Sequence, residues 1–158
     1  MPHFTHTTFV IERTLPGSPK HAFRFFSEPA LKRRWTSCHP DWQEIEARCD
    51  FRVGGEELSR LKSPDGKVHE FRSRYLDILE AGHIVYAFTM RTDDVLISSS
   101  MATIEFKPSS MAASTAMLYT EQAAFLGGED AIAPRREGTG HGFDRLVTEI
   151  GRGSEARP

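Results

Sequence analysis

The stretch LYTEQAAFLGGEDAIAPRREGTGHGFDRL (residues 118–146) passes from a strand pattern to a helix pattern through a glycine-rich, acidic loop. Its first part belongs to a predicted strand at 114–125, in which Met117, Tyr119 and Glu121 share one face. If the two apolar side chains face the core, the period of two turns the carboxylate inward as well.

A long amphipathic helix is predicted after the loop, from about Arg135 to Gly151. Its apolar residues recur at i, i+3, i+4 and i+7, which places them on one face. They are Phe143, Leu146, Val147 and Ile150. We expect one domain over residues 1–151, with a mobile tail at 152–158.

The N-terminal part predicts one strand and two short helices. The strand covers 8–15, and Ser18 can cap the helix that follows. Pro29 opens the second helix, whose apolar face carries Trp35, and the basic run Lys32-Arg33-Arg34 is expected to face water.

The middle of the chain has the alternation and turn residues of strands. They are predicted near 44–53, 56–62, 67–79, 82–91 and 96–107. With the first and last strands they make a mostly antiparallel sheet, and only the C-terminal helix is long enough to cover one face. The predicted fold class is therefore α+β, a curved antiparallel sheet around a long C-terminal helix.

Composition excludes several classes of protein. The 158 residues carry 20 basic and 22 acidic side chains, so no bulk charge favours nucleic acid. No apolar run is long enough for a membrane span and no signal peptide is recognisable, so we expect a cytoplasmic protein.

No cofactor or metal site is predicted. The chain has no phosphate-binding or dinucleotide motif, and Gly54-Gly55 is simplest as a turn or bulge. Cys38, His39 and Asp41 form a small group of ligand types on one loop, but no partner set occurs elsewhere.

Several stretches resemble one family in the right order. Besides residues 118–146 they are TTFVIERTLPGSPKHAFRFFSEPALKRRW (7–35), DFRVGGEE (50–57), RYLDILEAGHIVYAFTM (74–90) and SSSMATIEFKP (98–108). Over roughly residues 7–150 the chain resembles bacterial START-like proteins of the SRPBCC superfamily, in the subgroup named after the activator of the heat-shock chaperone ATPase (AHSA-type).

The resemblance implies a helix-grip (START-like, Bet v-like) fold with a cavity between the sheet and the C-terminal helix. Members of the superfamily bind lipids, hormones or polyketides, a few act as cyclases, and others assist a chaperone. Fold alone does not decide among these. The side chains expected to line the cavity are Trp35, Trp42, Phe51, Tyr75, Tyr86, Phe88, Ile104, Met117, Tyr119, Glu121 and Phe143.

Two carboxylates are candidate acid–base groups. Glu121 in an apolar cavity could serve as a general base or anchor a ligand. Alternatively, it could lie at the strand end and either cap a loop amide or pair with an arginine. Asp77 is two residues from Tyr75 and would share its face, with Glu70, Arg72 and Arg74 in the alternate register. Such a set could orient a polar substrate group inside a pocket, or it could form a cross-strand charge ladder on the solvated face.

Three functions follow as hypotheses. The first is binding of a small, largely apolar molecule, with no or only weak enzymatic activity. The second is a cyclase- or hydrolase-like enzyme that uses Glu121 or Asp77. The third is a chaperone-activator-like adaptor, which would need an exposed apolar patch. A homodimer through an edge strand or through the outer face of the sheet is compatible with the sequence.

Overall fold

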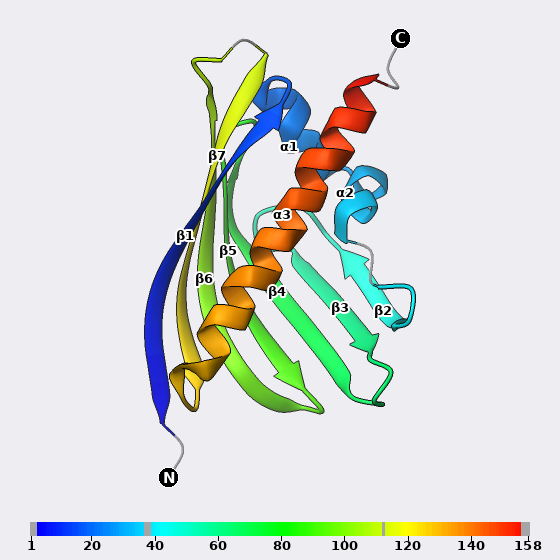
Figure 1. Cartoon of the computed structure of the whole chain (residues 1–158), viewed down its shortest axis with the longest axis vertical. Helices are drawn as coiled ribbons and strands as arrows, with labels where there is room; N and C mark the ends of the chain where they lie inside the picture. The colour runs from blue at the N-terminus through cyan, green and yellow to red at the C-terminus, as the bar shows by residue number, and fades with distance from the viewer. Residues whose placement is uncertain (1–2, 37–38, 112, 156–158) are drawn as a thin grey trace.

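The structure is a computed structural model that describes residues 3–36, 39–111 and 113–155. Within these residues seven strands form one antiparallel sheet, ordered β1-β7-β6-β5-β4-β3-β2 (Figure 1). The strands are β1 (Phe4–Pro16), β2 (Gln43–Cys49), β3 (Glu56–Lys62), β4 (Val68–Leu79), β5 (His83–Thr92), β6 (Val95–Pro108) and β7 (Ser114–Leu126). The predicted order of elements along the chain is confirmed, and the first strand begins four residues earlier than expected.

Two short helices follow β1, as predicted. In α1 (Pro19–Ser27) the Ser18 hydroxyl accepts a hydrogen bond from the His21 amide at 3.2 Å. This cap satisfies one of the free amides of the first turn. Pro19, at the first helical position, has no backbone N–H and so leaves none unpaired there. Helix α2 (Pro29–Thr36) buries Trp35, whose indole nitrogen donates to the backbone oxygen of Phe25 at 2.8 Å.

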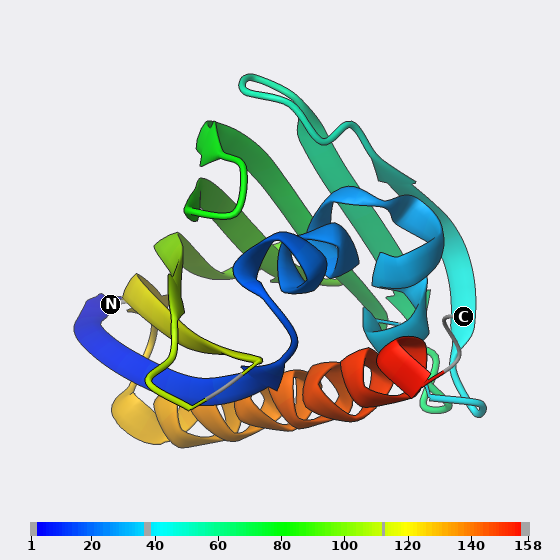
Figure 2. The same ribbon diagram turned by 90° about the horizontal axis from the view of Figure 1, so that it is seen from above.

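The long helix α3 (Ile132–Glu155) crosses the concave face of the sheet, preceded by the short 3₁₀ helix η1 (Glu129–Ala131). Figure 2 shows the sheet as an arc, with α1 and α2 inside it and α3 spanning its open side. The helix begins three residues before the predicted start, because Pro134 is compatible with a first turn. It also continues to Glu155, beyond the predicted end near Gly151, and residues 156–158 lie outside the described part.

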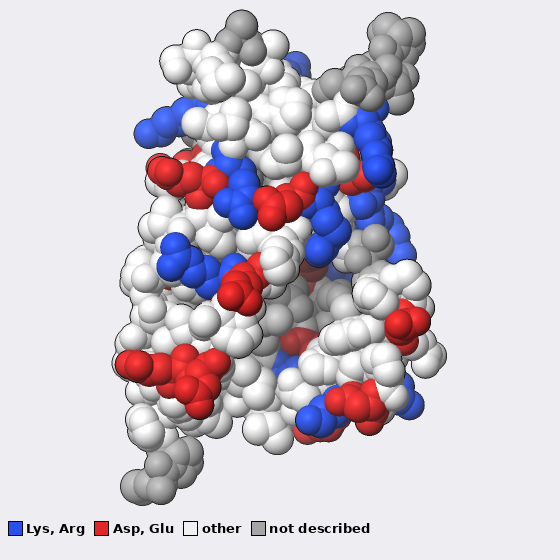
Figure 3. Space-filling model, in the orientation of Figure 1, with Lys and Arg blue, Asp and Glu red and all other residues white. Residues whose placement is uncertain are grey.

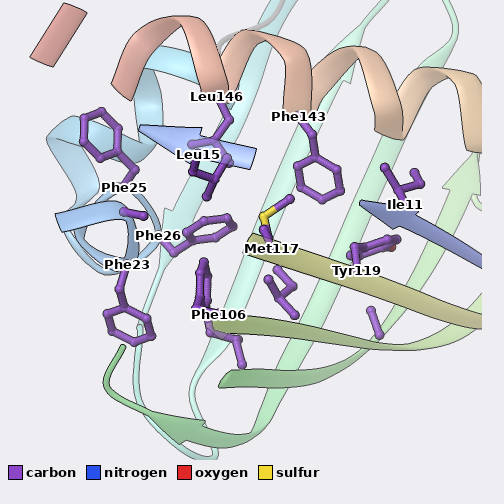
Figure 4. Close-up of a cluster of buried hydrophobic side chains, with 14 of the residues drawn as sticks. Ile11, Leu15, Phe23, Phe25, Phe26, Phe106, Met117, Tyr119, Phe143 and Leu146 are labelled. Carbon is purple, nitrogen blue, oxygen red and sulfur yellow. The ribbon is translucent and has the colours of Figure 1, made fainter. Parts of the chain in front are cut away.

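The core is densest where α3 and α1 meet β1, β6 and β7. Phe143 and Leu146 of α3 face Leu15, Met117 and Tyr119, which come from β1 and β7 (Figure 4). Helix α1 adds three buried phenylalanines, Phe23, Phe25 and Phe26. We call this region (β1, β6 and β7 with α1 and α3) the packed half of the molecule; aromatic burial there provides much of the driving force for folding.

The helix-grip fold class is thereby confirmed. The apolar face of the C-terminal helix is indeed the face that covers the sheet, since Phe143, Leu146 and Ile150 are all buried. The two edge strands are β1 and β2.

Candidate functional site

A pocket of about 440 Å³ lies in the other half of the molecule. Its walls come mainly from α2 and from strands β2 to β5, and α3 contributes Phe143. We call this region (β2, β3 and β4 with α2) the pocket half; Figure 3 shows the surface hollowed beside α3. The volume falls in the range of about 300–1,000 Å³ that is usual for small-molecule sites.

Aromatic rings form much of the pocket wall. Phe51 meets Tyr75 edge to face, with ring centroids 5.0 Å apart, and Tyr86 lies 6.2 Å from Tyr75. Trp35 and Phe143 are tilted against each other at 6.1 Å, where the pocket meets the core. Such walls provide a large apolar contact area for a ligand.

A polar cluster is built into this wall by Lys32 of α2, Glu57 of β3 and Tyr75 of β4. The Lys32 ammonium donates to Glu57 Oε1 at 2.6 Å and to the Tyr75 hydroxyl at 3.1 Å. The Tyr75 hydroxyl donates to the same Glu57 oxygen at 2.9 Å. The charged side chains are only 14% and 19% exposed, so their ion pair is screened less than one on the open surface. We call these three residues the Lys32 cluster.

Tyr75 remains a proton donor in this cluster. Burial, and then the nearby charge of Glu57, raises the pKa of Tyr75 well above its usual value. The Cys49 sulfur lies 3.5 Å from the same hydroxyl. The hydroxyl is thus held on three sides, which fixes its direction toward Glu57.

The glycine pair before β3 holds the backbone at Tyr75. The Gly54 amide donates to the Tyr75 carbonyl at 2.8 Å, and the Tyr75 amide donates to the Gly55 carbonyl at 3.0 Å. A β-carbon on Gly55 would meet the backbone oxygen of Asp50 at 2.0 Å, so only glycine fits there. The pair is a turn, as the sequence indicates, and it ties the loop to the pocket strand.

Asp77 does not share the face of Tyr75. The register of β4 against β5 shifts between these two residues, at a bulge that adds one residue to β4. The side chain of Asp77 is consequently 63% exposed, and its Oδ2 lies 2.7 Å from the His83 Nε2, within hydrogen-bonding distance. The expectation that Asp77 faces a cavity is therefore wrong, because the period of two holds only along an unbroken strand.

Glu121 is completely buried, but it belongs to the packed half and does not line the pocket. Ser100 donates to it at 2.8 Å, Tyr119 at 2.6 Å and Arg135 of α3 at 3.0 Å. Arg135 also donates to Ser98 at 2.5 Å, and its guanidinium lies over the Phe125 ring, 4.8 Å from the centroid. Glu121 therefore has the structural role of pairing with an arginine and not the predicted role of a cavity base. The pair anchors the start of α3 to the sheet.

The structure brings six of the eleven predicted cavity residues to the pocket. They are Trp35, Phe51, Tyr75, Tyr86, Ile104 and Phe143. The other five lie elsewhere: Trp42, Phe88, Met117, Tyr119 and Glu121. Of these, Trp42 lies against His69, with ring centroids 4.9 Å apart, and the rest belong to the packed interior of the sheet face.

Sequence reasoning missed the charged members of the site. Lys32 was expected to face water with Arg33 and Arg34, yet its side chain enters the pocket wall. A signal for this was present, because Lys32 precedes the buried Trp35 by three residues and thus shares its side of the helix. Glu57 gave no comparable signal, since its partner on β4 depends on the register between the strands.

The described residues contain no group of three or more His, Cys, Asp or Glu side chains placed to hold a metal ion. His39 and Asp41 lie beside each other on an exposed loop, and the Cys38 position falls outside the part of the chain that the structure describes. None of the helices in the described ranges is long and apolar enough to cross a membrane.

The curved sheet, the helix across its concave face and the pocket between them define a helix-grip protein of the SRPBCC type. More narrowly, the chain belongs to the Activator of Hsp90 ATPase homolog 1-like protein family, whose model matches residues 16–151. The family resemblance seen in the sequence is confirmed.

Solved structures agree with this assignment. An uncharacterised protein from Rhizobium leguminosarum is 36% identical, with a TM-score of 0.89 over 96% of this chain and 99% of that chain. A Rhizobium loti protein is also 36% identical, with a TM-score of 0.85 over 93% and 99%. An AHSA1-like protein from Aeromonas hydrophila has the same fold at 18% identity, with a TM-score of 0.66 over 94% of each chain. No curated protein matches the chain.

Proposed function

We propose that this protein binds a small, largely apolar molecule in the pocket between α2, Phe143 and strands β2 to β5. The observation that carries the proposal is the pocket itself, about 440 Å³ in volume and walled by aromatic rings with one polar cluster. Apolar walls with a few fixed polar groups are the usual composition of a small-molecule site.

The position of the site differs from the simplest expectation for this fold. In the packed half, side chains fill the space under α3, and Phe143 is the residue of the helix that reaches the pocket. A ligand would therefore contact α2 and the strands far more than α3.

Native mass spectrometry of freshly purified protein, compared with its denatured mass, tests this function. We expect an additional mass of roughly a few hundred daltons, as a pocket of this size would accept, that disappears on denaturation. An unoccupied protein that also fails to bind apolar probes would contradict the proposal. The same spectrum counts the subunits and so tests whether the protein forms a homodimer.

The geometry gives less support to a cyclase- or hydrolase-like enzyme that uses Glu121 or Asp77. Glu121 is committed to Arg135, and Asp77 lies on the outer side of the sheet. Neither carboxylate can reach a molecule in the pocket.

The adaptor hypothesis also gains no specific support. The exposed large apolar side chains of the described residues come from different strands and loops, and they include Phe4, Ile45, Leu76 and Met111. Isolated exposed apolar residues are normal on protein surfaces and do not indicate a partner.

A further inference from the structure

The Lys32 cluster has hydrogen-bonding capacity that its own members do not use. A lysine ammonium has three donors, and two of them are directed to Glu57 and Tyr75. Glu57 receives both of its hydrogen bonds on Oε1, and no described residue donates to Oε2. One ammonium donor of Lys32 and one acceptor atom of Glu57, Oε2, therefore remain on two residues that line the pocket.

A buried hydroxyl, that of Ser73, lies next to the Lys32 cluster. Ser73 lies opposite Glu57 in the strand register and between Phe71 and Tyr75 on the same face of β4. It is 3% exposed, and its hydroxyl has no partner among the described residues. A buried polar group without a partner is costly, but Ser73 does not line the pocket, so its hydroxyl adds polarity behind the cluster and provides no contact for a ligand.

The charges around the pocket are balanced. Lys32 pairs with Glu57 within the wall, and Arg33 pairs with Glu44 nearer the surface at 3.2 Å. Arg48, also at the pocket, lies 3.5 Å from Glu46. An anionic ligand would meet the charge of Glu57 and a cationic one the charge of Lys32, so neither is favoured.

We infer that the bound molecule carries a neutral hydroxyl group, as an alcohol or phenol, which donates to Glu57 and accepts from Lys32. A hydroxyl is one group that donates and accepts at the same atom, which matches the single donor and single acceptor left in the cluster. This inference rests on the proposed function, since it specifies the chemistry of a ligand in the same pocket.

Three probes with one ring system test the inference by calorimetric titration at neutral pH: 2-naphthol, 2-methoxynaphthalene and 2-naphthoate. We expect the wild-type protein to bind 2-naphthol at least about tenfold more tightly than either of the others, because hydrogen bonds to charged groups are strong. Equal affinity for the naphthol and its methyl ether overturns the hydroxyl inference while leaving the pocket as an apolar site.

The variant Glu57→Gln makes the test sharper, because it removes the negative charge and leaves Lys32 unbalanced. We expect 2-naphthoate to bind at least about tenfold more tightly to Glu57→Gln than to the wild type, and 2-naphthol to lose its advantage. The matched control is Glu44→Gln, which neutralises a more exposed carboxylate at the same pocket and should leave the order of the three probes unchanged. The same response in both variants overturns the inference.

A second variant keeps the test decisive if Glu57→Gln does not fold. Lys32→Met retains an aliphatic side chain on α2 and should reduce the preference for naphthol over its ether to less than about threefold. An unchanged preference overturns the inference. Failure of all three probes to bind the wild type also overturns it, and together with an unoccupied native spectrum it overturns the proposed function as well.

Discussion

The packed half and the pocket half each contain a carboxylate, a cation and a tyrosine hydroxyl, but they use them differently. In the packed half, Glu121 receives hydrogen bonds from Arg135, Tyr119 and Ser100 and is fully buried. In the pocket half, Glu57 is bonded by Lys32 and Tyr75 on one oxygen and remains partly accessible. A saturated polar network holds elements together, whereas an unsaturated one at a pocket can recognise a ligand.

The largest difference should appear when one cation of each pair is removed. Arg135→Ala leaves Glu121 buried without its charge partner, and we expect it to lower the free energy of unfolding by about 3–5 kcal/mol. Lys32→Ala leaves a carboxylate that water can reach, and about 1 kcal/mol is expected. Urea denaturation measures both. Similar losses in the two variants would contradict the distinction between a structural and a ligand-facing pair.

Enlarging one alanine in each half tests which half has space. Ala102 of β6 is completely buried opposite Tyr86 and Glu121, so Ala102→Leu should cost about 1–3 kcal/mol through overpacking. Ala47 of β2 lies on the pocket wall, and Ala47→Leu should change stability by no more than about 0.5 kcal/mol. Thermal and urea denaturation of both variants supply the measurement. Ala47→Leu should also weaken binding of 2-naphthol, and unchanged binding would place the ligand elsewhere.

A third prediction concerns alkaline pH and all three tyrosines of the chain. Burial raises the pKa of Tyr75, Tyr86 and Tyr119 in the folded protein. Above a pH of about 10 the unfolded chain binds fewer protons than the folded one, so stability falls as the pH rises. Each tyrosine should contribute a slope of up to about 1.4 kcal/mol per pH unit, which Tyr119→Phe should remove for one of them.

Tyrosinate absorbance gives the corresponding measurement. We expect the tyrosines to ionise together with unfolding, in one cooperative step, and not individually near pH 10. Independent ionisation of one tyrosine in the folded protein would show that its surroundings are open to solvent. If that tyrosine were Tyr75, its ionisation would show that solvent reaches the pocket half more readily than the packed half.

The sequence alone determined the architecture, because period-two and period-3.6 patterns report which face of each element is buried. The alternation in the strands and the apolar face of the helix at Phe143 predicted a mostly antiparallel sheet covered by a C-terminal helix, and the family resemblance specified the helix-grip fold. The capping residue Ser18 likewise predicted where the first helix begins. These signals depend on residues that are close in sequence, so they can be recognised without knowing which distant segments pack together.

Only the tertiary structure decided which residues form the site. Met117, Tyr119 and Glu121 face inward as the alternation requires, yet they meet α3 and Arg135 there and not a pocket. Asp77 faces outward because a bulge precedes it in β4. Lys32 faces the pocket wall, where it pairs with Glu57, a residue 25 positions away. Pattern fixes the side of an element on which a residue lies, but what lies opposite depends on register, bulges and helix placement, which arise from packing between distant segments.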